Sequence, residues 1–562
     1  MTKMMICFAL CLAAVGCGDV VGKSVDANPC PGTVCECTAA TEATDCGAHE
    51  ACDESGGSRV CACVPTYTDQ GGTCVFTGGP TDFGFQDPTK WTPIGTSGVM
   101  VLATATGKVQ PGEAAIDKDG ACQYGGIKQT FTMPPFDRAD PMKLSVTYTV
   151  NDPMFNFPFN TTLQIGVGSQ FMEVVAPRNT YKTSSFCLGP GAFGGPVTFQ
   201  IAMAANGPCT TTSTSSVRID EMKLELAGAG ECPREAGVVN GGFQLATGWS
   251  FPNVNGGAGQ ILPNIGENGT FAAQLTQATR CSDVSAEGTI SVPSEAKIPH
   301  PALDVYWNGT SGARLAVSLA GKGIGTLNAN GQIKHSRICI PKWAVGNVSS
   351  LSFFAQRISD NNCTALSRTF ILDNMTIVDE PACGMLGDVT DPSFERITNL
   401  MGPVPGWALN HGYVNDVEGA RAFIINNGPN AASGTGVLRT SNSNPCVGIG
   451  EGGADFAFIV PPASGTSGPA VKFSAKADVA NVNSETRALL LPQSPTNASR
   501  LVPETGAHTP NVLCIPPTLV GRLVGARLTT GGLGGGCAPT TYEEFGFFDD
   551  VSVGTDPSCP AQ

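Results

Sequence analysis

Hydrophobic and polar residues alternate with a period of two along much of this chain. In residues 143–150 every second position is Leu, Val or Tyr, and residues 313–319 follow the same pattern. Such alternation is typical of half-buried β-strands, because successive side chains point to opposite faces. The 70 Gly and 41 Pro supply turns, and no long segment carries a convincing helical period. We therefore predict an all-β protein built from antiparallel β-sandwiches.

One set of strand patterns occurs three times. Each repeat opens on a Phe followed by a Trp and closes on a strand that contains an Asp. The openings are Gly84-Phe85-Gln86 with Trp91, Gly242-Phe243-Gln244 with Trp249, and Ser393-Phe394-Glu395 with Trp407; the closing strands hold Asp220, Asp373 and Asp549. An internal repeat defines the domain map, so we predict β-sandwich repeats at 78–232, 233–383 and 384–559. Openings and closings of this kind suit a jelly roll whose two ends lie side by side.

Each repeat also holds four cysteines at similar spacing. Four cysteines allow three connectivities, and the spacing alone does not choose among them. A bond between the third and fourth is awkward, because the closing strand starts soon after the third cysteine and runs away from it. We favour second with third and first with fourth: Cys187–Cys209 and Cys122–Cys232, Cys339–Cys363 and Cys281–Cys383, Cys514–Cys537 and Cys446–Cys559.

The first residues are predicted to be a targeting segment. Lys3 precedes an apolar stretch that is too short to span a bilayer as a mature helix. The sequence that ends in Cys17 resembles the lipobox of bacterial lipoproteins, which implies a signal peptide at 1–16, a lipid on Cys17 and a tether at 17–29. Of 23 cysteines, 20 then remain for disulfides, an even number. The alternative is an ordinary signal peptide, which would leave one free thiol.

Eight cysteines follow within residues 30–74. The later part resembles an EGF-like module, a likeness carried by Cys61-Ala62-Cys63, Tyr67 and Gly71-Gly72. The resemblance implies the pairs Cys37–Cys52, Cys46–Cys61 and Cys63–Cys74, with Cys30–Cys35 as an additional bridge. A zinc site is disfavoured, because there is no Cys-x2-Cys pair and only His49 lies nearby. We expect a rigid spacer or a protein-contact surface.

The repeats themselves resemble bacterial carbohydrate-binding modules of the galactose-binding-like jelly-roll type. The likeness is carried by openings such as 239–244 with Trp249 and by the Asp-bearing closing strands. It implies a sugar ligand and a structural calcium, held in repeat three by Glu395 and Asp549. Repeats one and two would offer only a neutral Gln oxygen, Gln86 with Asp220 and Gln244 with Asp373. The alternative, favoured in repeats one and two and open in repeat three, is that the Asp caps a turn by accepting backbone hydrogen bonds.

Exposed aromatic rings are the usual platforms for sugar rings. Trp91, Trp249 and Trp407 occupy one repeat position, which indicates core. Trp307 and Trp343 are not shared among the repeats and are our candidate ligand-binding residues, with core packing as the alternative for both. The run of Phe155, Phe157 and Phe159 is either a binding strip or core.

The composition and the motifs narrow the function. The formal charge is −15, which gives no electrostatic basis for binding nucleic acid. The sequence contains no Gly-x-Ser-x-Gly and no His-Glu-x-x-His motif, so we predict a protein that is not an enzyme. We expect an exported, lipid-anchored protein, displayed outward from the outer membrane, that binds glycan or matrix polymer. Two alternatives are a structural or protein–protein adhesion role, with the repeats as spacers, and a component of a glycan-active enzyme.

Overall fold

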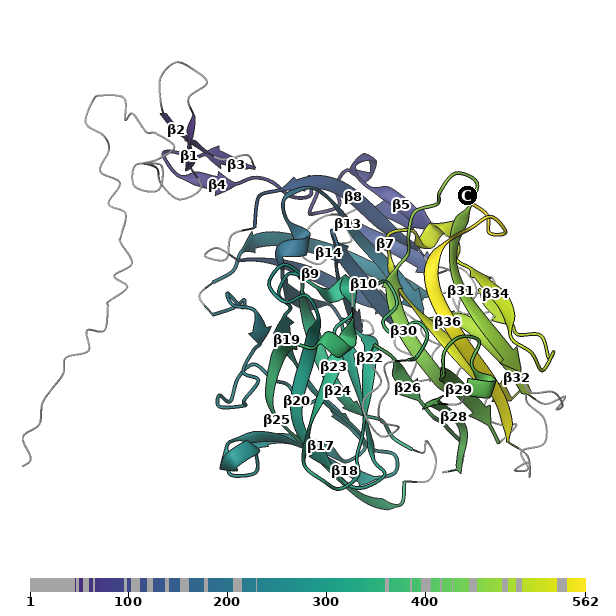
Figure 1. Cartoon of the computed structure of the whole chain (residues 1–562). Coiled ribbons are helices and arrows are strands. Elements are labelled where there is room, and N and C mark those ends of the chain that lie inside the picture. The colour runs from purple at the N-terminus through teal and green to yellow at the C-terminus, as the bar shows by residue number, and fades with distance from the viewer. Residues whose placement is uncertain are drawn as a thin grey trace, which may run out of the picture. The chain divides into compact units, whose positions relative to one another are not determined.

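The computed structural model describes Cys46, residues 50–53, 60–63 and 66–95, and most of the chain from Val99 to Ala561. The gaps after Val99 are residues 103–111, 119–124, 137–140, 152–160, 176–179, 206–214, 229, 359–362, 385–386, 396–405, 415–416, 427, 444–451, 478–483, 492–497 and 533–542. The chain forms two compact units, residues 1–77 and 78–562. The predicted all-β class is confirmed: the described elements are antiparallel strands and short 3-10 turns (Figure 1). No helix in these residues is long and apolar enough to cross a membrane.

The described residues of the N-terminal unit form two small hairpins. Strand β1 (Glu50–Asp53) pairs with β2 (Val60–Cys63), and β3 (Tyr67–Asp69) pairs with β4 (Cys74–Phe76). Disulfides join Cys46 to Cys61 and Cys63 to Cys74, which are two of the three pairs that the EGF-like resemblance implies. Cys52 is also disulfide-bonded. The lipid carrier Cys17 and the cysteines Cys30, Cys35 and Cys37 lie outside the described residues.

Each of the three repeats is a sandwich of two sheets. We call the sheet that contains the closing Asp-bearing strand the closing sheet, and the other the docking sheet. In repeat one the docking sheet has the order β11-β10-β13-β8-β5 and the closing sheet β12-β9-β14-β7-β6. The bounds are β5 (Thr92–Gly95), β6 (Val99–Leu102), β7 (Glu113–Lys118), β8 (Gly125–Met133), β9 (Met142–Asn151), β10 (Thr161–Val167), β11 (Gln170–Val175), β12 (Lys182–Cys187), β13 (Gly195–Ala205) and β14 (Ser215–Leu226).

Repeat two follows the same strand order. Its docking sheet is β15-β19-β24-β21-β22, with β16 also paired to β19, and its closing sheet is β17-β18-β25-β20-β23. The bounds are β15 (Gly237–Val238), β16 (Asn253–Val254), β17 (Gly257–Leu262), β18 (Ala272–Thr279), β19 (Asp283–Ser291), β20 (Pro301–Gly309), β21 (Arg314–Leu319), β22 (Lys322–Asn328), β23 (Lys334–Cys339), β24 (Val348–Ala355) and β25 (Ala365–Asp379).

Repeat three repeats the architecture again. The docking sheet is β26-β30-β35-β32-β33 and the closing sheet β27-β28-β29-β36-β31-β34. The bounds are β26 (Ala408–Asn410), β27 (Gly412–Val414), β28 (Val417–Asn426), β29 (Gly436–Asn442), β30 (Gly453–Ile459), β31 (Gly468–Ala477), β32 (Ser484–Leu491), β33 (Ser499–Leu501), β34 (Thr509–Cys514), β35 (Leu523–Gly532) and β36 (Glu544–Asp556). The 3-10 turns are η1 (Pro88–Lys90), η2 (Pro190–Ala192), η3 (Glu267–Gly269), η4 (Lys342–Ala344), η5 (Pro381–Cys383), η6 (Gly428–Asn430) and η7 (Pro517–Leu519).

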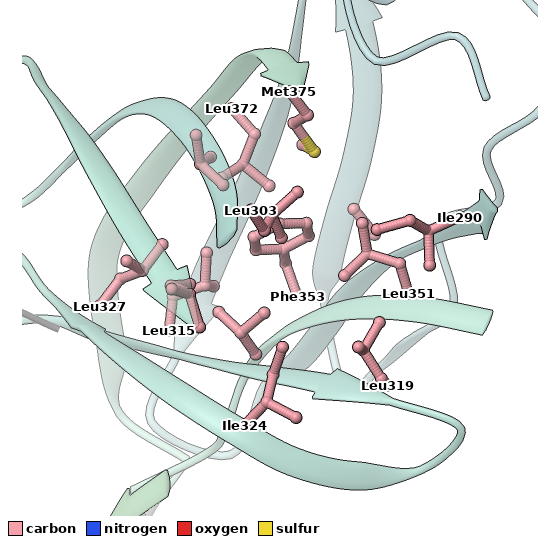
Figure 2. Close-up of a cluster of buried hydrophobic side chains, with 14 of the residues drawn as sticks. Ile290, Leu303, Leu315, Leu319, Ile324, Leu327, Leu351, Phe353, Leu372 and Met375 are labelled. Carbon is pink, nitrogen blue, oxygen red and sulfur yellow. The ribbon is translucent and has the colours of Figure 1, made fainter. Parts of the chain in front are cut away.

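The core of repeat two shows how the sequence pattern specifies the sandwich. Buried and partly exposed residues alternate strictly along β21, and the buried set includes Leu315 and Leu319. These side chains meet Leu303 and Leu372 from the closing sheet (Figure 2). Because one face of each sheet is apolar, packing the two faces together removes both from water.

The opening motif builds the same turn in all three repeats. Phe85, Phe243 and Phe394 are buried and adopt a positive φ of 53°, 52° and 57°. Each ring packs on the Trp of its own motif, with ring centroids 5.1, 4.9 and 4.9 Å apart. The residue two places after each closing Asp donates its N–H to the opening turn, at Phe83, Gly241 and Pro392. The opening and closing ends of each repeat therefore lie side by side.

The disulfides of the repeats correct the predicted connectivity. Cys187 is bonded to Cys232, Cys339 to Cys383, Cys514 to Cys559 and Cys281 to Cys363. The second cysteine of each repeat thus pairs with the fourth, and in repeat two the first pairs with the third. The predicted pairing is therefore wrong for all six favoured bonds: Cys187–Cys209, Cys122–Cys232, Cys339–Cys363, Cys281–Cys383, Cys514–Cys537 and Cys446–Cys559. Cys122, Cys209, Cys446 and Cys537 themselves lie outside the described residues.

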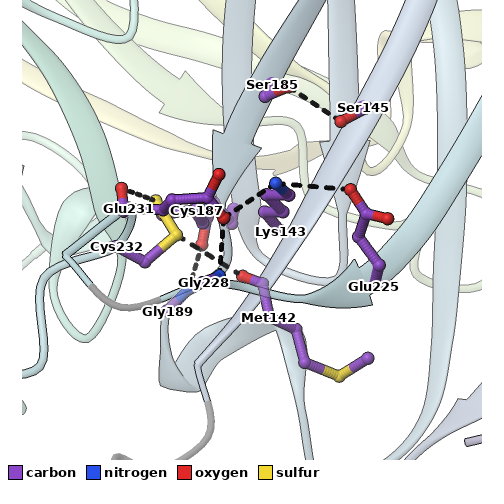
Figure 3. The surroundings of a disulfide bond; sticks show 11 residues. Met142, Lys143, Ser145, Ser185, Cys187, Gly189, Glu225, Gly228, Glu231 and Cys232 are labelled. Carbon is purple, nitrogen blue, oxygen red and sulfur yellow. Dashed lines mark hydrogen bonds and ion pairs between the residues drawn. A yellow bond between two sulfur atoms is a disulfide. The ribbon is translucent and has the colours of Figure 1, made fainter.

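Strand register explains this connectivity. In repeat one, Cys187 lies opposite Lys143, and Lys143 lies opposite Glu225 of the closing strand. The chain turns shortly after Glu225 and brings Cys232 back to Cys187 (Figure 3). In repeat two, the pair Thr279↔Ala365 places Cys281 opposite Cys363 in the same way. The closing strand does run away from the third cysteine, but it runs toward the second.

The docking sheets are the surfaces through which the repeats contact one another. Gln164 of repeat one donates from Nε2 to the Leu523 carbonyl of repeat three at 2.6 Å. Lys322 of repeat two forms an ion pair with Glu173 of repeat one. Phe171 of repeat one and Leu523 join the apolar cluster of repeat two. Residues 78–562 therefore form one packed unit and not three independent domains.

Candidate functional site

The two tryptophans that the sequence suggested as ligand platforms are buried. Trp307 is 1% exposed and donates from Nε1 to the Ser336 hydroxyl at 2.8 Å. Trp343 is 7% exposed. Neither ring presents a face to solvent, so the assignment of Trp307 and Trp343 as ligand-binding residues is wrong, and the core alternative describes both. The run 155–159 lies outside the described residues.

Glu395 and Asp549, the predicted calcium ligands, bind the same loop through its backbone. Glu395 Oε1 accepts from the N–H groups of Thr435 and Gly436, both at 2.7 Å. Asp549 Oδ2 accepts from Ala432 and Ser433 at 2.7 and 2.9 Å. Burial raises the pKa of Asp549, and these hydrogen bonds oppose the rise. Because N–H donors occupy the carboxylate oxygens, the arrangement fits a loop cap better than a cation site.

The equivalent Asp of repeat two has the same role. Asp373 Oδ2 accepts from the Glu267 N–H at 2.8 Å and from the Thr270 hydroxyl at 2.7 Å. Its Oδ1 accepts from the following Asn374 N–H at 2.7 Å. Among the described residues, no group of three or more His, Cys, Asp or Glu side chains is placed to hold a metal ion. These contacts do not test calcium binding at Glu395 and Asp549 directly, and the experiment that separates it from the loop cap is given below.

A pocket opens between the docking sheet of repeat two and the start of repeat three. The space within it is about 490 Å³ when the open mouth is included, but only about 50 Å³ of this is cavity volume, so it is a shallow depression and not an enclosed cavity. Polar and apolar side chains share the lining, and the Phe354 ring is part of it. The lining residues are Gly312, Arg314, Ala316, Thr326, Phe354, Gln356, Arg357, Ile358, Arg368, Leu409, Asn410 and His411. We call this the junction pocket.

Strand register builds the floor of the junction pocket. Ala316 of β21 lies opposite Thr326 of β22 on one side and opposite Phe354 of β24 on the other. The three residues therefore form a row across the sheet. Arg314 and Gln356 are two positions along their chains from this row, so they share its face. The small Ala316 leaves space above the middle of the floor, beside the half-buried Phe354 ring.

Repeat three supplies one wall, and hydrogen bonds fix it in place. The Leu409 N–H donates to Thr326 Oγ1 at 3.0 Å, and the same hydroxyl donates to the Leu409 carbonyl at 3.1 Å. Asn410 donates from Nδ2 to Asp455 Oδ2 at 2.6 Å, and Arg527 forms two hydrogen bonds with Asp455. This wall is therefore pre-organised, which lowers the entropy lost when a ligand binds.

The charged side chains in the described lining of the junction pocket are arginines. Arg314, Arg357 and Arg368 line it, and none of its described lining residues is Asp or Glu. Asp283 accepts the Arg357 N–H at 2.6 Å and lies 3.8 Å from Arg357 Nε. Since a guanidinium offers several N–H donors in one plane, the pocket can bind oxygen atoms of a ligand in pairs.

Sequence reasoning missed this pocket for a physical reason. Its residues come from five strands and two repeats, and no two of the arginines are close in sequence. The available signal was weak: Arg314 and Phe354 occupy polar-face positions of alternating strands, where solvent or a ligand is expected.

A second polar cluster lies on the closing sheet of repeat two. His335 lies between two carboxylates, with Nε2 3.2 Å from Glu267 Oε1 and Nδ1 3.4 Å from Asp304 Oδ1. The Tyr306 ring contacts the His335 ring edge-on, with centroids 5.4 Å apart. Partial burial lowers the pKa of His335, but the hydrogen bond to Glu267 and the charges of Asp304 and Glu267 outweigh it and raise the pKa above 6.5.

Comparison with known proteins gives structural neighbours but no family. No protein-family model matches the chain, and no curated protein matches it. Among solved structures, the chain is similar to the tandem of two family 22 carbohydrate-binding modules from Paenibacillus barcinonensis Xyn10C, at 13% identity and a TM-score of 0.18, covering 54% of this chain and 96% of that one.

Single modules of two other families are also similar to this chain. One is a family 61 carbohydrate-binding module in complex with β-1,4-galactotriose, at 12% identity and a TM-score of 0.21. The other is the family 11 module from Clostridium thermocellum in complex with a β-1,3-1,4-mixed-linked tetrasaccharide, at 12% identity and a TM-score of 0.19. Each covers 26% of this chain and 97% of the module. The assignment of the fold rests on the sheets described above.

Proposed function

We propose that this protein is a surface glycan-binding protein and that the junction pocket holds its ligand. The observation that carries the proposal is the lining of that pocket, where the half-buried Phe354 ring is surrounded by guanidinium and amide groups. A sugar presents an apolar ring face and a set of hydroxyl groups. An aromatic ring binds the first, and planar N–H donors bind the second.

The segments that precede the repeats would hold the pocket at the cell surface. We propose that Cys17 carries a lipid and that the EGF-like unit is a spacer between the anchor and residues 78–562. The proposed role is non-enzymatic. Several modest contacts can give firm attachment when many copies on one surface bind the same polymer.

Binding of the full oxidised chain to a panel of neutral and acidic polysaccharides tests this function. We expect at least one polymer to be retained, and Phe354→Ala to weaken its binding about tenfold through loss of the ring. The matched control is Phe271→Ala, which removes a 41% exposed ring that does not line the pocket. Retention of no polysaccharide by a folded sample would overturn the proposal in favour of protein adhesion.

The anchor has its own test. Mass analysis of the protein purified from membranes should show a diacylglyceryl group on an N-terminal Cys17, and Cys17→Ser should release the protein into the soluble fraction. An unmodified Cys17 would establish the ordinary signal peptide instead.

A further inference from the structure

We propose that repeat three carries a second glycan contact, on the outer face of its closing sheet, where Arg439 binds the carboxylate of an acidic sugar unit. This inference rests on the proposed glycan-binding function, but its site is separate from the junction pocket. Arg439 lies between two half-buried rings, with its guanidinium carbon 5.5 Å from the ring centroid of Phe423 and 5.1 Å from that of Phe545. We call these three residues, together with Phe547 and Lys476, the arginine strip.

Strand register builds the arginine strip. Phe423 of β28 lies opposite Arg439 of β29, which lies opposite Phe547 of β36. Phe547 in turn lies opposite Lys476 of β31. Phe545 is two positions from Phe547 along β36, so it shares the same face. This is the outer face, because the residues on either side of Arg439 along β29 are fully buried. Rings and cations therefore alternate along one row that crosses four strands.

The other two repeats build the same row from different side chains. Aligned on the closing Asp, the equivalent positions hold Met100, Ala115, Arg218 and Thr149 in repeat one and Gln260, Gln274, Ile371 and Asn308 in repeat two. Neither row places a cation beside an aromatic ring. The sandwich therefore forms without an arginine strip, and a function specific to repeat three is expected where its side chains differ from those of the other repeats.

The contacts of Arg439 leave its hydrogen-bond donors available to a ligand. Among the described residues, its Nε is buried without a hydrogen-bond partner, and no carboxylate forms an ion pair with the guanidinium. A guanidinium that lies over aromatic rings keeps its N–H groups at its edge, where the two oxygen atoms of a carboxylate can accept them. The rings also restrict the side chain and exclude water, which strengthens an ion pair and lowers the entropy lost on binding.

Lys476 provides a second cation on the same row. Its Nζ lies 5.1 Å from the ring centroid of Phe547 and donates to Asn430 Oδ1 at 2.6 Å. Lys476 is two strands away from Arg439, which is about 10 Å at the usual strand spacing. A polysaccharide that lies across the strands can therefore place the carboxylates of different sugar units near the two cations. C–H groups of the sugar rings can contact the exposed parts of the phenylalanine rings.

Glu543 limits where the anionic group can lie. It precedes Phe545 by two positions, on the same face, and accepts from the Ser441 hydroxyl at 2.6 Å. Because like charges repel, we expect the acidic sugar unit on the side of Arg439 that faces Lys476. A neutral sugar gains no ion pair from either cation, so the arginine strip should distinguish acidic from neutral glycans.

Polygalacturonate, its carboxyl-reduced neutral form and polyglutamate of similar length are the probes for the full oxidised chain. We expect polygalacturonate to bind at least about tenfold more tightly than the neutral form, and added salt to reduce this preference. Arg439→Gln should weaken polygalacturonate binding about fivefold to thirtyfold and leave binding of the neutral form unchanged. Arg439→Lys keeps the charge over the rings but lacks the paired donors, so it should lose part of the preference without unfolding the sheet.

Arg337→Gln is the matched control, because Arg337 is an exposed arginine on the outer face of the closing sheet of repeat two, where it pairs with Glu380. Phe354→Ala, in the junction pocket, should weaken binding of both polysaccharides and keep their ratio.

The outcomes separate this inference from the proposed function. Binding of polygalacturonate no tighter than that of the neutral form, or a preference that neither Arg439 variant reduces, would overturn the inference and leave glycan binding standing. Tighter binding of polyglutamate than of polygalacturonate would also overturn it, in favour of an acidic protein partner. Retention of no polysaccharide at all would instead remove the proposed function, and this inference with it.

Discussion

At the scale of single residues, the closing aspartates show how one side chain organises a turn. Asp549 is fully buried and accepts three N–H groups, from Ala432, Ser433 and Asp550. A carboxylate without these donors would lose solvation without compensation. The loop therefore depends on the carboxylate, and the carboxylate depends on the loop.

Asp549→Ala should lower the free energy of unfolding by about 2–4 kcal/mol, because it leaves buried N–H groups without an acceptor. Calcium should not change the melting temperature of the unmodified protein, since the carboxylate oxygens already accept N–H groups. The stability of the variant and the effect of calcium on the melting temperature are both measured by thermal unfolding, once with calcium and once with chelator. Asp550→Ala, at the exposed neighbouring position, should lower the free energy of unfolding by a smaller amount. A calcium-dependent rise in melting temperature that Asp549→Ala abolishes would establish the cation site instead.

His335 predicts a pH effect at the same scale. Since its pKa is raised above 6.5 by Glu267 and Asp304, it stabilises the fold below pH 6.5 and this stabilisation is lost as the pH rises through the raised pKa. The effect should stay below about 1 kcal/mol, because the side chain is 44% exposed and solvent screens the pair. NMR titration of the imidazole gives the pKa directly, and His335→Gln should remove the corresponding slope from the stability profile. An imidazole pKa at or below 6.5 would contradict the bridging geometry.

At the scale of elements, one disulfide connects the same two places of the closing sheet in all three repeats. The bonds Cys187–Cys232, Cys339–Cys383 and Cys514–Cys559 span 45, 44 and 45 residues, nearly the same length in each repeat. Each begins at the end of an edge strand that lies one strand away from the closing strand. The crosslink therefore ties the edge strand to the C-terminal end of its own repeat.

Replacing Cys339 and Cys383 together by Ser should destabilise repeat two by about 4 kcal/mol in the chain-entropy description of a loop of this length. Denaturant unfolding of the oxidised protein measures it. Proteolysis without reduction should release a peptide that joins Cys339 to Cys383 and another that joins Cys281 to Cys363. A peptide that links Cys339 to Cys363 would contradict the register described here.

The sequence defined some elements and not others for identifiable reasons. The Phe–Trp openings, the Asp-bearing closings and the alternating strands are local patterns, and they mark the strands and the core positions of Trp91, Trp249 and Trp407. Disulfide pairing depends on which strands are neighbours, which spacing along the chain does not contain. The burial of Trp307 and Trp343 depends on the same non-local packing, and the junction pocket exists only where two repeats meet.

At the scale of the whole molecule, the docking sheets convert three similar folds into one unit. Both faces of β35 are buried, one by the core of repeat three and the other by its neighbours. A sheet that would be half-solvated in a lone module is covered here, and buried polar groups such as Gln164 find partners across the junction. The repeats should therefore unfold together, and the pocket between repeats two and three should be lost when they separate.

Thr326 offers a direct way to test this coupling. Its hydroxyl both accepts the Leu409 N–H and donates to the Leu409 carbonyl in a buried position, so Thr326→Val leaves two backbone groups without a partner. We expect the free energy of unfolding to fall by about 1–3 kcal/mol. We also expect ligand binding in the pocket to weaken, because β26 is no longer hydrogen-bonded to Thr326 of β22. Thr326→Ser keeps the hydroxyl and should retain both stability and ligand binding. Differential scanning calorimetry would show one transition in the unmodified unit and a split or broadened one in Thr326→Val. Separate transitions in the unmodified protein would mean that the repeats are independent, and a site formed by two of them would then lack a stable wall.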